Sequence, residues 1–168
     1  YGNLEGPAII SVHGGPGSAS KPKHAARFDL SKYRVVVFDQ RGCGKSEYED
    51  MLRENTTAKL ASDMERIREE LEIESWIVTG SSWGSSLSLF YAQSYPEKVD
   101  ALLLSAIFLG DSLTMEWFAG SVGVSSLYTD VWDHRNTQLQ KLDITASSAK
   151  EINQKLHTLE GAQLHSLV

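Results

Sequence analysis

The chain is short of cysteine, lacks an excess of positive charge and has no long apolar run. Its 168 residues include a single cysteine, so no internal disulfide can form, and a reducing compartment such as the cytoplasm is expected. Sixteen lysines and arginines against 22 aspartates and glutamates give a formal net charge of −6, which argues against a general nucleic-acid or anionic-membrane surface. No run approaches the roughly 20 apolar residues of a membrane span. We therefore expect a cytoplasmic protein with neither nucleic acid nor membrane as a partner.

The remaining composition suits a globular protein. Hydrophobic residues make up 41% of the chain and charged residues 23%, and the length is sufficient for a sizeable core. The chain begins at Tyr1 without a methionine, so we interpret it as a fragment or processed part of a longer protein. Its single cysteine and five histidines form no ligand-like cluster in the sequence, so we expect neither a metal nor an organic cofactor.

Four apolar runs predict β-strands, and they cover residues 8–13, 35–39, 75–79 and 99–107. Between the second and third runs, apolar residues recur at helical spacing from Leu60 to Leu71, after capping residues at 55–57. The charged residues of this helix are expected to form a solvated face. Strands that alternate with helices predict an α/β fold with a mostly parallel sheet and helices on both faces.

The third predicted strand runs into a Gly-x-Ser-x-Gly turn at residues 80–84, with Ser82 at its centre. The pattern alone is weak, since chance gives roughly one match per twenty chains of this length. Its position after a strand and before helix-forming residues favours a nucleophile elbow over a plain strand–turn–helix joint. In such an elbow Ser82 is the nucleophile, and the backbone N–H of Trp83 points at the developing oxyanion.

The first predicted strand ends in a glycine-rich loop, His13-Gly14-Gly15-Pro16-Gly17. Such a loop lets the backbone approach a ligand closely, and together with the elbow it favours a second oxyanion donor over a simple turn. His13 is better interpreted as ordering this loop than as a general base, because triad histidines follow the serine in this topology.

The loop after the second predicted strand contains Gly42-Cys43-Gly44-Lys45-Ser46, which looks like a phosphate loop. The first glycine of that motif is missing, because Asp39 stands five residues before Gly44. We therefore do not expect a nucleotide site. Cys43 has no visible activating partner and is better interpreted as a small packed residue than as a nucleophile.

After residue 110 the sequence changes in character. Residues 111–168 contain no run as strong as the four predicted strands and are richer in helix formers and polar residues. A capping box at residues 148–151 predicts a further helix. We divide the chain into a partial core at 1–110 and an incomplete helical cap at 111–168. The aromatic residues of the cap are expected to pack rather than to contact substrate.

Several motifs together resemble one family. They are HGGPG at 13–17, DQRGCGKS at 39–46, NTT at 55–57 and GSSWGSSL at 80–87, and they occur in the order found in proline iminopeptidases. These enzymes are serine peptidases of the α/β-hydrolase fold that remove an N-terminal proline. The resemblance covers residues 1 to about 118, and the three longer motifs together are much narrower than Gly-x-Ser-x-Gly alone.

The resemblance implies a role for individual residues. Ser82 would be the nucleophile, and the backbone N–H groups of Gly15 and Trp83 would form the oxyanion hole. His13 and Gly14 would belong to the substrate-binding loop. The segment LEGA at 159–162 looks like the family's Trp-Glu-Gly-Ala, in which the glutamate binds the substrate's α-ammonium group, so Glu160 would hold a peptide by its free N-terminal proline.

The acid and the histidine of a triad should follow the elbow at strand ends. We assign no base among the histidines, which either precede the serine or lie in cap-like sequence: His24, His134, His157 and His165. Asp111 follows the fourth predicted strand but is not favoured as the acid. We therefore expect both partners outside this chain, which alone should be inactive. Alternatives are an esterase or amidase with the same chemistry, and a non-catalytic binding module that lacks the triad.

Overall fold

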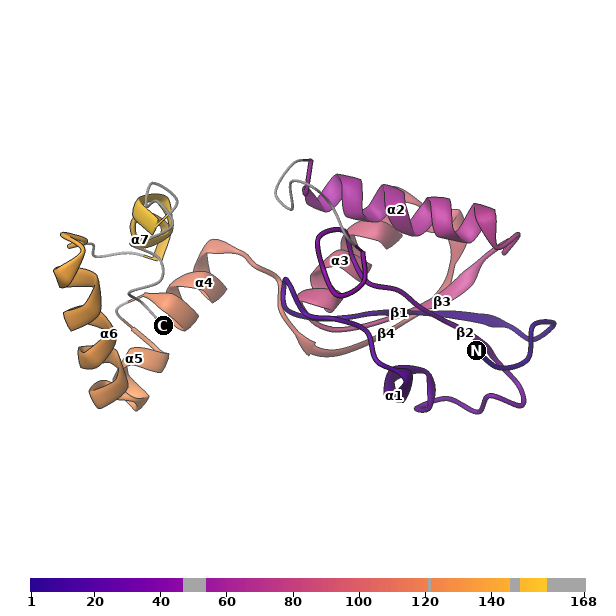
Figure 1. Ribbon diagram of the computed structural model, residues 1–168, viewed down its shortest axis with the longest axis horizontal. Coiled ribbons are helices and arrows are strands. Elements are labelled where there is room, and N and C mark those ends of the chain that lie inside the picture. The colour runs from indigo at the N-terminus through magenta and orange to yellow at the C-terminus, as the bar shows by residue number, and fades with distance from the viewer. Residues whose placement is uncertain (47–53, 121, 146–148, 157–168) are drawn as a thin grey trace. The chain divides into compact units, whose positions relative to one another are not determined.

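The computed structural model describes residues 1–46, 54–120, 122–145 and 149–156 (Figure 1). The chain divides into two compact units, Tyr1–Leu109 and Gly110–Val168. The first unit contains the sheet, and the described part of the second contains helices only. No helix in the described part of the chain is both long enough and apolar enough to cross a membrane.

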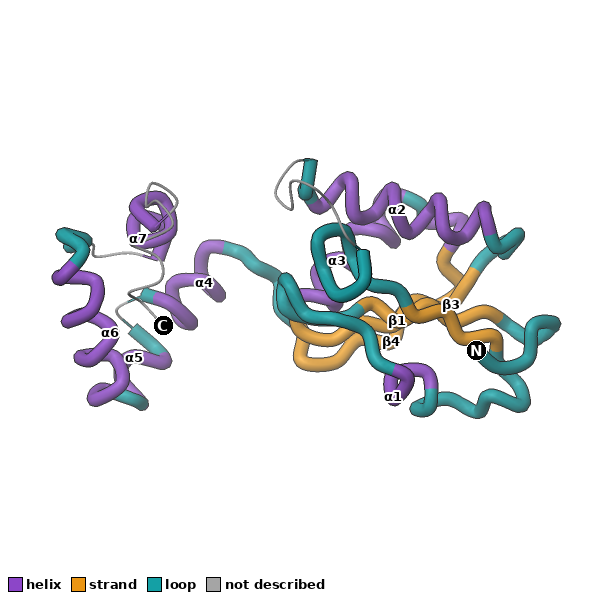
Figure 2. Tube along the Cα trace, in the orientation of Figure 1, coloured by secondary structure: helices purple, strands orange, loops and turns teal. Residues whose placement is uncertain are grey.

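The sheet of the first unit has four parallel strands (Figure 2). They are β1 (Ala8–Val12), β2 (Arg34–Val37), β3 (Trp76–Ser82) and β4 (Val99–Ile107), in the spatial order β2-β1-β3-β4. The predicted parallel α/β sheet is confirmed. Because all four strands run the same way, the loops that follow them emerge at one edge of the sheet, where α/β folds bind ligands.

Helices cover both faces of this sheet (Figure 1). On one face α2 (Thr57–Glu70) and α3 (Trp83–Ser94) enclose the larger core, in which Met64, Trp76 and Tyr91 are fully buried. On the other face the short α1 (Pro22–Ala25) covers a smaller cluster around Ile9. A 3₁₀ turn, η1 (Pro96–Lys98), ends α3 and leads into β4.

The N-terminus of α2 follows the prediction, since the Thr56 side chain accepts a hydrogen bond from the Lys59 N–H at 3.3 Å. The solvated face expected for this helix is wrong in part, because Arg68 is only 8% exposed. Its Nε donates to Glu65 Oε2 at 3.0 Å, and the Tyr91 hydroxyl donates to the same oxygen at 2.7 Å. The hydrogen bonds from Arg68 hold the pKa of Glu65 below its usual range. The charged pair lies within α2, and the Tyr91 hydroxyl of α3 binds its carboxylate, so α3 lies against this part of the helix.

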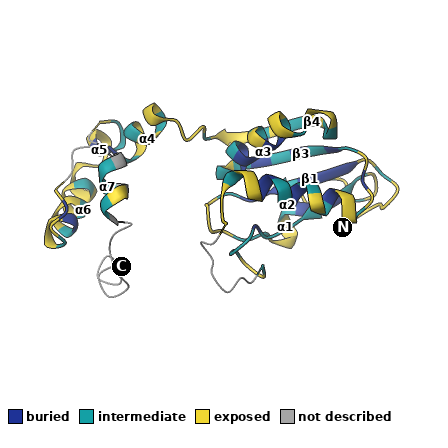
Figure 3. Ribbon diagram, turned by 90° about the horizontal axis from the view of Figure 1, so that it is seen from above, coloured by how far each residue is buried: buried dark blue, intermediate teal, exposed yellow. Residues whose placement is uncertain are grey.

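The second unit is helical. It contains α4 (Ser112–Ala119), α5 (Val124–Leu127), α6 (Thr129–Lys141) and α7 (Ala149–Leu156). Leu139 and Ile144 are buried, whereas many large apolar side chains are exposed (Figure 3): Leu113, Trp117, Phe118, Leu127, Tyr128 and Val131. Within the described residues Trp117, Phe118 and Tyr128 are exposed, so their packing stays a prediction. The capping box predicted at 148–151 begins at Ser148, which lies outside the described residues.

Candidate active site

Ser82 occupies the junction between β3 and α3. It is the last residue of the strand and the N-cap of the helix, with φ 57° and ψ −130°. A positive φ is unfavourable for a residue that carries a Cβ, and such strain costs on the order of 1–3 kcal/mol. Strand β3 ends at Ser82, three residues beyond the predicted end at residue 79, because Gly80, Ser81 and Ser82 all pair with β4. The strained turn leaves Ser82 exposed at the edge of the sheet.

The two glycines of the elbow motif are required by close backbone packing. A Cβ on Gly84 would lie 2.9 Å from the carbonyl oxygen of His13, and one on Gly80 would lie 2.5 Å from Ser88 Oγ. Real Cβ atoms essentially never approach heavy atoms this closely. The helix α3 can therefore start directly against β1 only because both positions lack a side chain.

Ser85 and a bulge in β4 hold the elbow in place. The Ser85 hydroxyl donates to the carbonyl oxygen of Ser82 at 2.6 Å and accepts from the Phe108 N–H at 2.9 Å. The register between β3 and β4 shifts at this point, where Ser82 pairs with Ile107 and Ala106 takes a positive φ of 44°. Bulges of this kind change the direction of side chains and occur often beside active sites.

The loop after β1 lies directly beside Ser82. A Cβ on Gly14 would lie 3.3 Å from Ser82 Cβ and 3.7 Å from Ser82 Oγ. Gly15, the next residue, has a φ of +127°, which residues with side chains rarely adopt. The structure thus brings Gly14, Gly15, Ser82 and Trp83 together at one edge of the sheet.

His13 is buried at the base of this loop, with 4% of its surface exposed. Its Nε2 accepts the backbone N–H of Gln40 at 3.0 Å, so that nitrogen carries no proton. Its Nδ1 therefore carries the proton and donates to the Gly14 carbonyl oxygen at 2.8 Å. Since both ring nitrogens bond to backbone groups, His13 holds the loop in place, and neither ring nitrogen is available to a ligand.

The loop after β2 is wrapped around the carboxylate of Asp39. Asp39 accepts the backbone N–H groups of Ser20 at 2.6 Å and of Lys45 at 2.8 Å. Burial acts to raise the pKa of Asp39, but these two N–H groups outweigh it and hold the pKa below its usual range. Two backbone N–H groups of this region are thus bound to the chain's own carboxylate.

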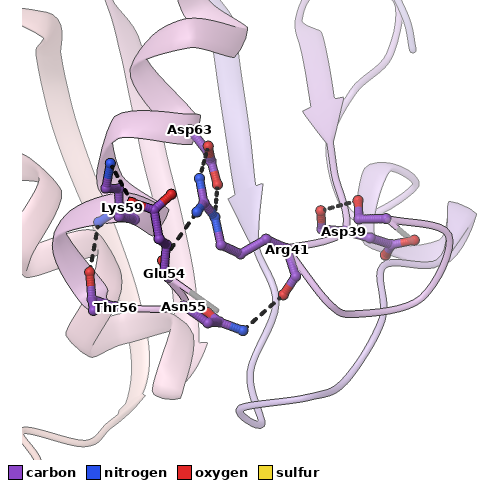
Figure 4. A network of polar contacts seen from close by, with 8 residues as sticks. Asp39, Arg41, Glu54, Asn55, Thr56, Lys59 and Asp63 are labelled. Carbon is purple, nitrogen blue, oxygen red and sulfur yellow. Dashed lines mark hydrogen bonds and ion pairs between the residues drawn. The ribbon is translucent and has the colours of Figure 1, made fainter. Parts of the chain in front are cut away.

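Arg41 ties the same loop to α2 (Figure 4). Its guanidinium binds Asp63 in a bidentate pair, with Nε–Oδ2 at 2.7 Å and Nη2–Oδ1 at 2.6 Å. It also donates to the Glu54 carbonyl oxygen at 3.1 Å, and Asn55 Nδ2 donates to the Arg41 carbonyl oxygen at 3.2 Å. The bidentate geometry fixes the orientation of the loop as well as its position.

The other candidate residues stand apart from Ser82 or outside the described residues. His24 lines a small polar hollow of about 130 Å³ whose lining includes Gly14 and Ser81 but not Ser82, and burial together with Arg27 lowers its pKa. Asp111 caps α4 by accepting the Thr114 N–H at 2.7 Å. His134 is exposed on α6. Three more lie outside the described residues: His157, Glu160 and His165.

Gln40 is a residue of this region to which the sequence analysis gave no role. It is 2% exposed and contacts both the loop after β1 and Trp83. The sequence signal that could have identified Gln40 is its position as a polar residue directly after the apolar run at 35–39. Among the described residues, no group of three histidine, cysteine, aspartate or glutamate side chains is placed to hold a metal ion.

The fold and the elbow together define a class of protein. Residues 7–140 match the sequence family described as alpha/beta hydrolase fold, and the chain belongs to that family. Within it, the chain is 45% identical over 132 residues to the proline iminopeptidase of Arabidopsis thaliana and 44% identical over 131 residues to that of Neisseria gonorrhoeae. The resemblance to proline iminopeptidases is thereby confirmed.

These matches cover 79% and 78% of this chain but only 34% and 42% of the two relatives, so the chain spans well under half of their length. Among solved structures, a proline iminopeptidase-related protein from Thermus thermophilus superposes with a TM-score of 0.64 at 24% identity, over 98% of this chain and 52% of that one. Epoxide hydrolase A from Mycobacterium thermoresistibile gives a TM-score of 0.52 at 24% identity, over 62% of this chain and 33% of that one. Both likenesses concern the fold.

Proposed function

We propose that the full-length protein is a serine aminopeptidase that releases proline from the N-terminus of small peptides. The observation that carries the proposal is the position of the loop after β1, with Gly14 packed beside the Ser82 side chain at the carboxyl edge of the sheet. The relatives named proline iminopeptidase support the choice of substrate. A chain with a single cysteine fits a cytoplasmic enzyme.

In this mechanism Ser82 Oγ attacks the carbonyl carbon of the N-terminal proline residue. A histidine from a part of the full-length protein outside this chain takes the hydroxyl proton, and an acid, also outside it, orients that histidine. The backbone N–H groups of Gly15 and Trp83 stabilise the oxyanion; that of Trp83 stands first in α3, where helical N–H groups lack an intrahelical acceptor. The C–N bond then breaks, the leaving amine takes the proton, and water hydrolyses the prolyl ester on Ser82.

The second unit supplies the substrate-binding part of the proposal. We assign residues 111–168 to a helical cap and Glu160 to the site that binds the free α-ammonium group of the substrate. A carboxylate in a partly buried site favours a cation, and a fixed distance between it and the nucleophile selects the terminal residue of a peptide.

Replacement of the nucleophile in the full-length protein tests the proposal. Ser82→Ala should lower the hydrolysis of a prolyl anilide by about 10⁴-fold or more and abolish labelling by a fluorophosphonate. Ser126→Ala, which removes an exposed hydroxyl from the second unit, is the matched control and should retain both. Turnover of the prolyl anilide by Ser82→Ala would refute the proposal, whereas turnover of acetyl esters in preference to prolyl and alanyl anilides would indicate an esterase.

A further inference from the structure

Gln40 joins the two segments that we assign to the oxyanion hole. Gln40 lies in the loop after β2, its side chain is buried, and both the nitrogen and the oxygen of its amide form hydrogen bonds. Nε2 donates to the carbonyl oxygen of His13 at 2.8 Å, and Oε1 accepts the indole N–H of Trp83 at 3.0 Å. Its backbone N–H donates in addition to His13 Nε2 at 3.0 Å. One residue thus binds the base of the loop after β1 and the first residue of α3.

The geometry of an oxyanion hole makes such a link important. Two backbone N–H groups must lie 2.7–3.1 Å from one oxygen position, although they belong to segments far apart in the chain. A misplacement of about 1 Å can lower the rate about 100-fold. Close packing of Gly84 against β1 brings the segments together, but a backbone contact of this kind does not fix the rotation of either segment. Hydrogen bonds from a buried amide do so, because they are directional.

We propose that Gln40 is a positioning residue for the oxyanion hole: it sets the loop that carries Gly15 and the residue Trp83 in the relative orientation that lets both N–H groups bind one oxygen. It does not touch the substrate. The identity of the reacting atoms rests on the proposed function. The bridge itself consists of the hydrogen bonds of Gln40 to His13 and Trp83.

The test is Gln40→Met in the full-length protein. Methionine has a similar length and volume but makes neither of the two side-chain hydrogen bonds. The kcat for a prolyl anilide should fall about 10- to 100-fold while KM changes less than about threefold, because the hole binds the oxyanion and not the ground-state carbonyl. Gln93→Met, the same change at an exposed position of α3, is the control and should leave kcat unchanged.

A second substrate pair separates a role in the hole from a general loss of structure. In a thiono ester, sulfur replaces the carbonyl oxygen and accepts hydrogen bonds weakly. The ratio of kcat/KM for a prolyl ester to that for its thiono counterpart should therefore fall in Gln40→Met and stay constant in Gln93→Met. A loss of activity with an unchanged ratio would overturn the proposal, as would an unchanged kcat.

Trp83→Phe removes the indole N–H that donates to Gln40 Oε1, and this variant replaces Gln40→Met as the test if Gln40→Met does not fold. It should lower kcat in the same direction, and the double variant should be no slower than Gln40→Met alone, because both changes remove one shared interaction. Strictly additive losses would count against the bridge. If no prolyl substrate is turned over but a fluorophosphonate labels Ser82, the proposed function fails; a labelling rate about 10-fold or more lower in Gln40→Met still supports the role of Gln40, and an equal rate refutes it.

Discussion

The loops after β1 and β2 leave neighbouring strands at the same edge of the sheet, and both are rich in glycine, but they are closed in different ways. The loop after β2 carries the carboxylate of Asp39, which accepts the N–H of Lys45 in the same loop and that of Ser20 near the end of the loop after β1. The loop after β1 is held from its base by His13 and Gln40, and Gly14 of this loop lies against the side chain of Ser82.

This difference shows which loop is suited to an external anion. In the loop after β2 the backbone N–H of Lys45 already binds the carboxylate of Asp39. The loop after β1 adjoins the exposed Ser82, where negative charge would develop in the proposed acyl transfer. Because both loops are rich in glycine, glycine content alone did not show which of them lies beside Ser82. Three substitutions test whether one loop serves catalysis and the other stability.

Gly14→Ala should have the largest effect, and it should appear in activity. The added Cβ would lie 3.0 Å from the Ser81 carbonyl oxygen and 3.3 Å from Ser82 Cβ, so the loop and Ser82 must shift apart. We expect kcat/KM for a prolyl anilide to fall about 100-fold, with a change in melting temperature of a few degrees at most. Ser18→Ala, an exposed change at the end of the same loop, is the control. Full activity in Gly14→Ala would remove this loop from the active site.

Gly44→Ala should have the opposite outcome in the loop after β2. Gly44 has a φ of +54°, and a Cβ there would lie 2.8 Å or less from the carboxylate of Asp39. Backbone strain and displacement of that carboxylate should together lower the free energy of unfolding by about 2 kcal/mol. Chemical denaturation measures this loss, and kcat at a temperature where the protein is folded should change less than about threefold. A large loss of kcat without a loss of stability would reverse the assignment of the two loops.

Local sequence patterns were sufficient for the strands, for α2 and for the position of the elbow. Apolar runs and helical periodicity depend on neighbouring residues, and the glycines at 80 and 84 are required by packing within the strand–turn–helix unit. The parts that the sequence did not reveal depend on contacts between distant segments. Gln40 bonds to residues 27 and 43 positions away, and Glu65, the partner of the buried Arg68, also accepts a hydrogen bond from Tyr91 on another helix. No periodicity records which distant group faces a buried polar side chain.

Asp39→Asn should have the smallest of the three effects, and pH reveals it. The pKa of Asp39 is lowered in the folded protein, so the carboxylate contributes stability that is fully present above the pKa of the unfolded chain and is lost as pH falls through the folded pKa. At neutral pH the substitution should cost about 1.5 kcal/mol, because an amide replaces a charged acceptor of two N–H groups. Below about pH 4 the difference should shrink, since the unsubstituted protein then loses the same contribution. Denaturation curves of both proteins between pH 7 and pH 3 measure it, with Asp100→Asn, at an exposed position, as the control. Parallel curves over this range would mean that the two N–H groups do not hold Asp39 as a carboxylate, and the loop after β2 would then be as open to an external anion as the loop after β1.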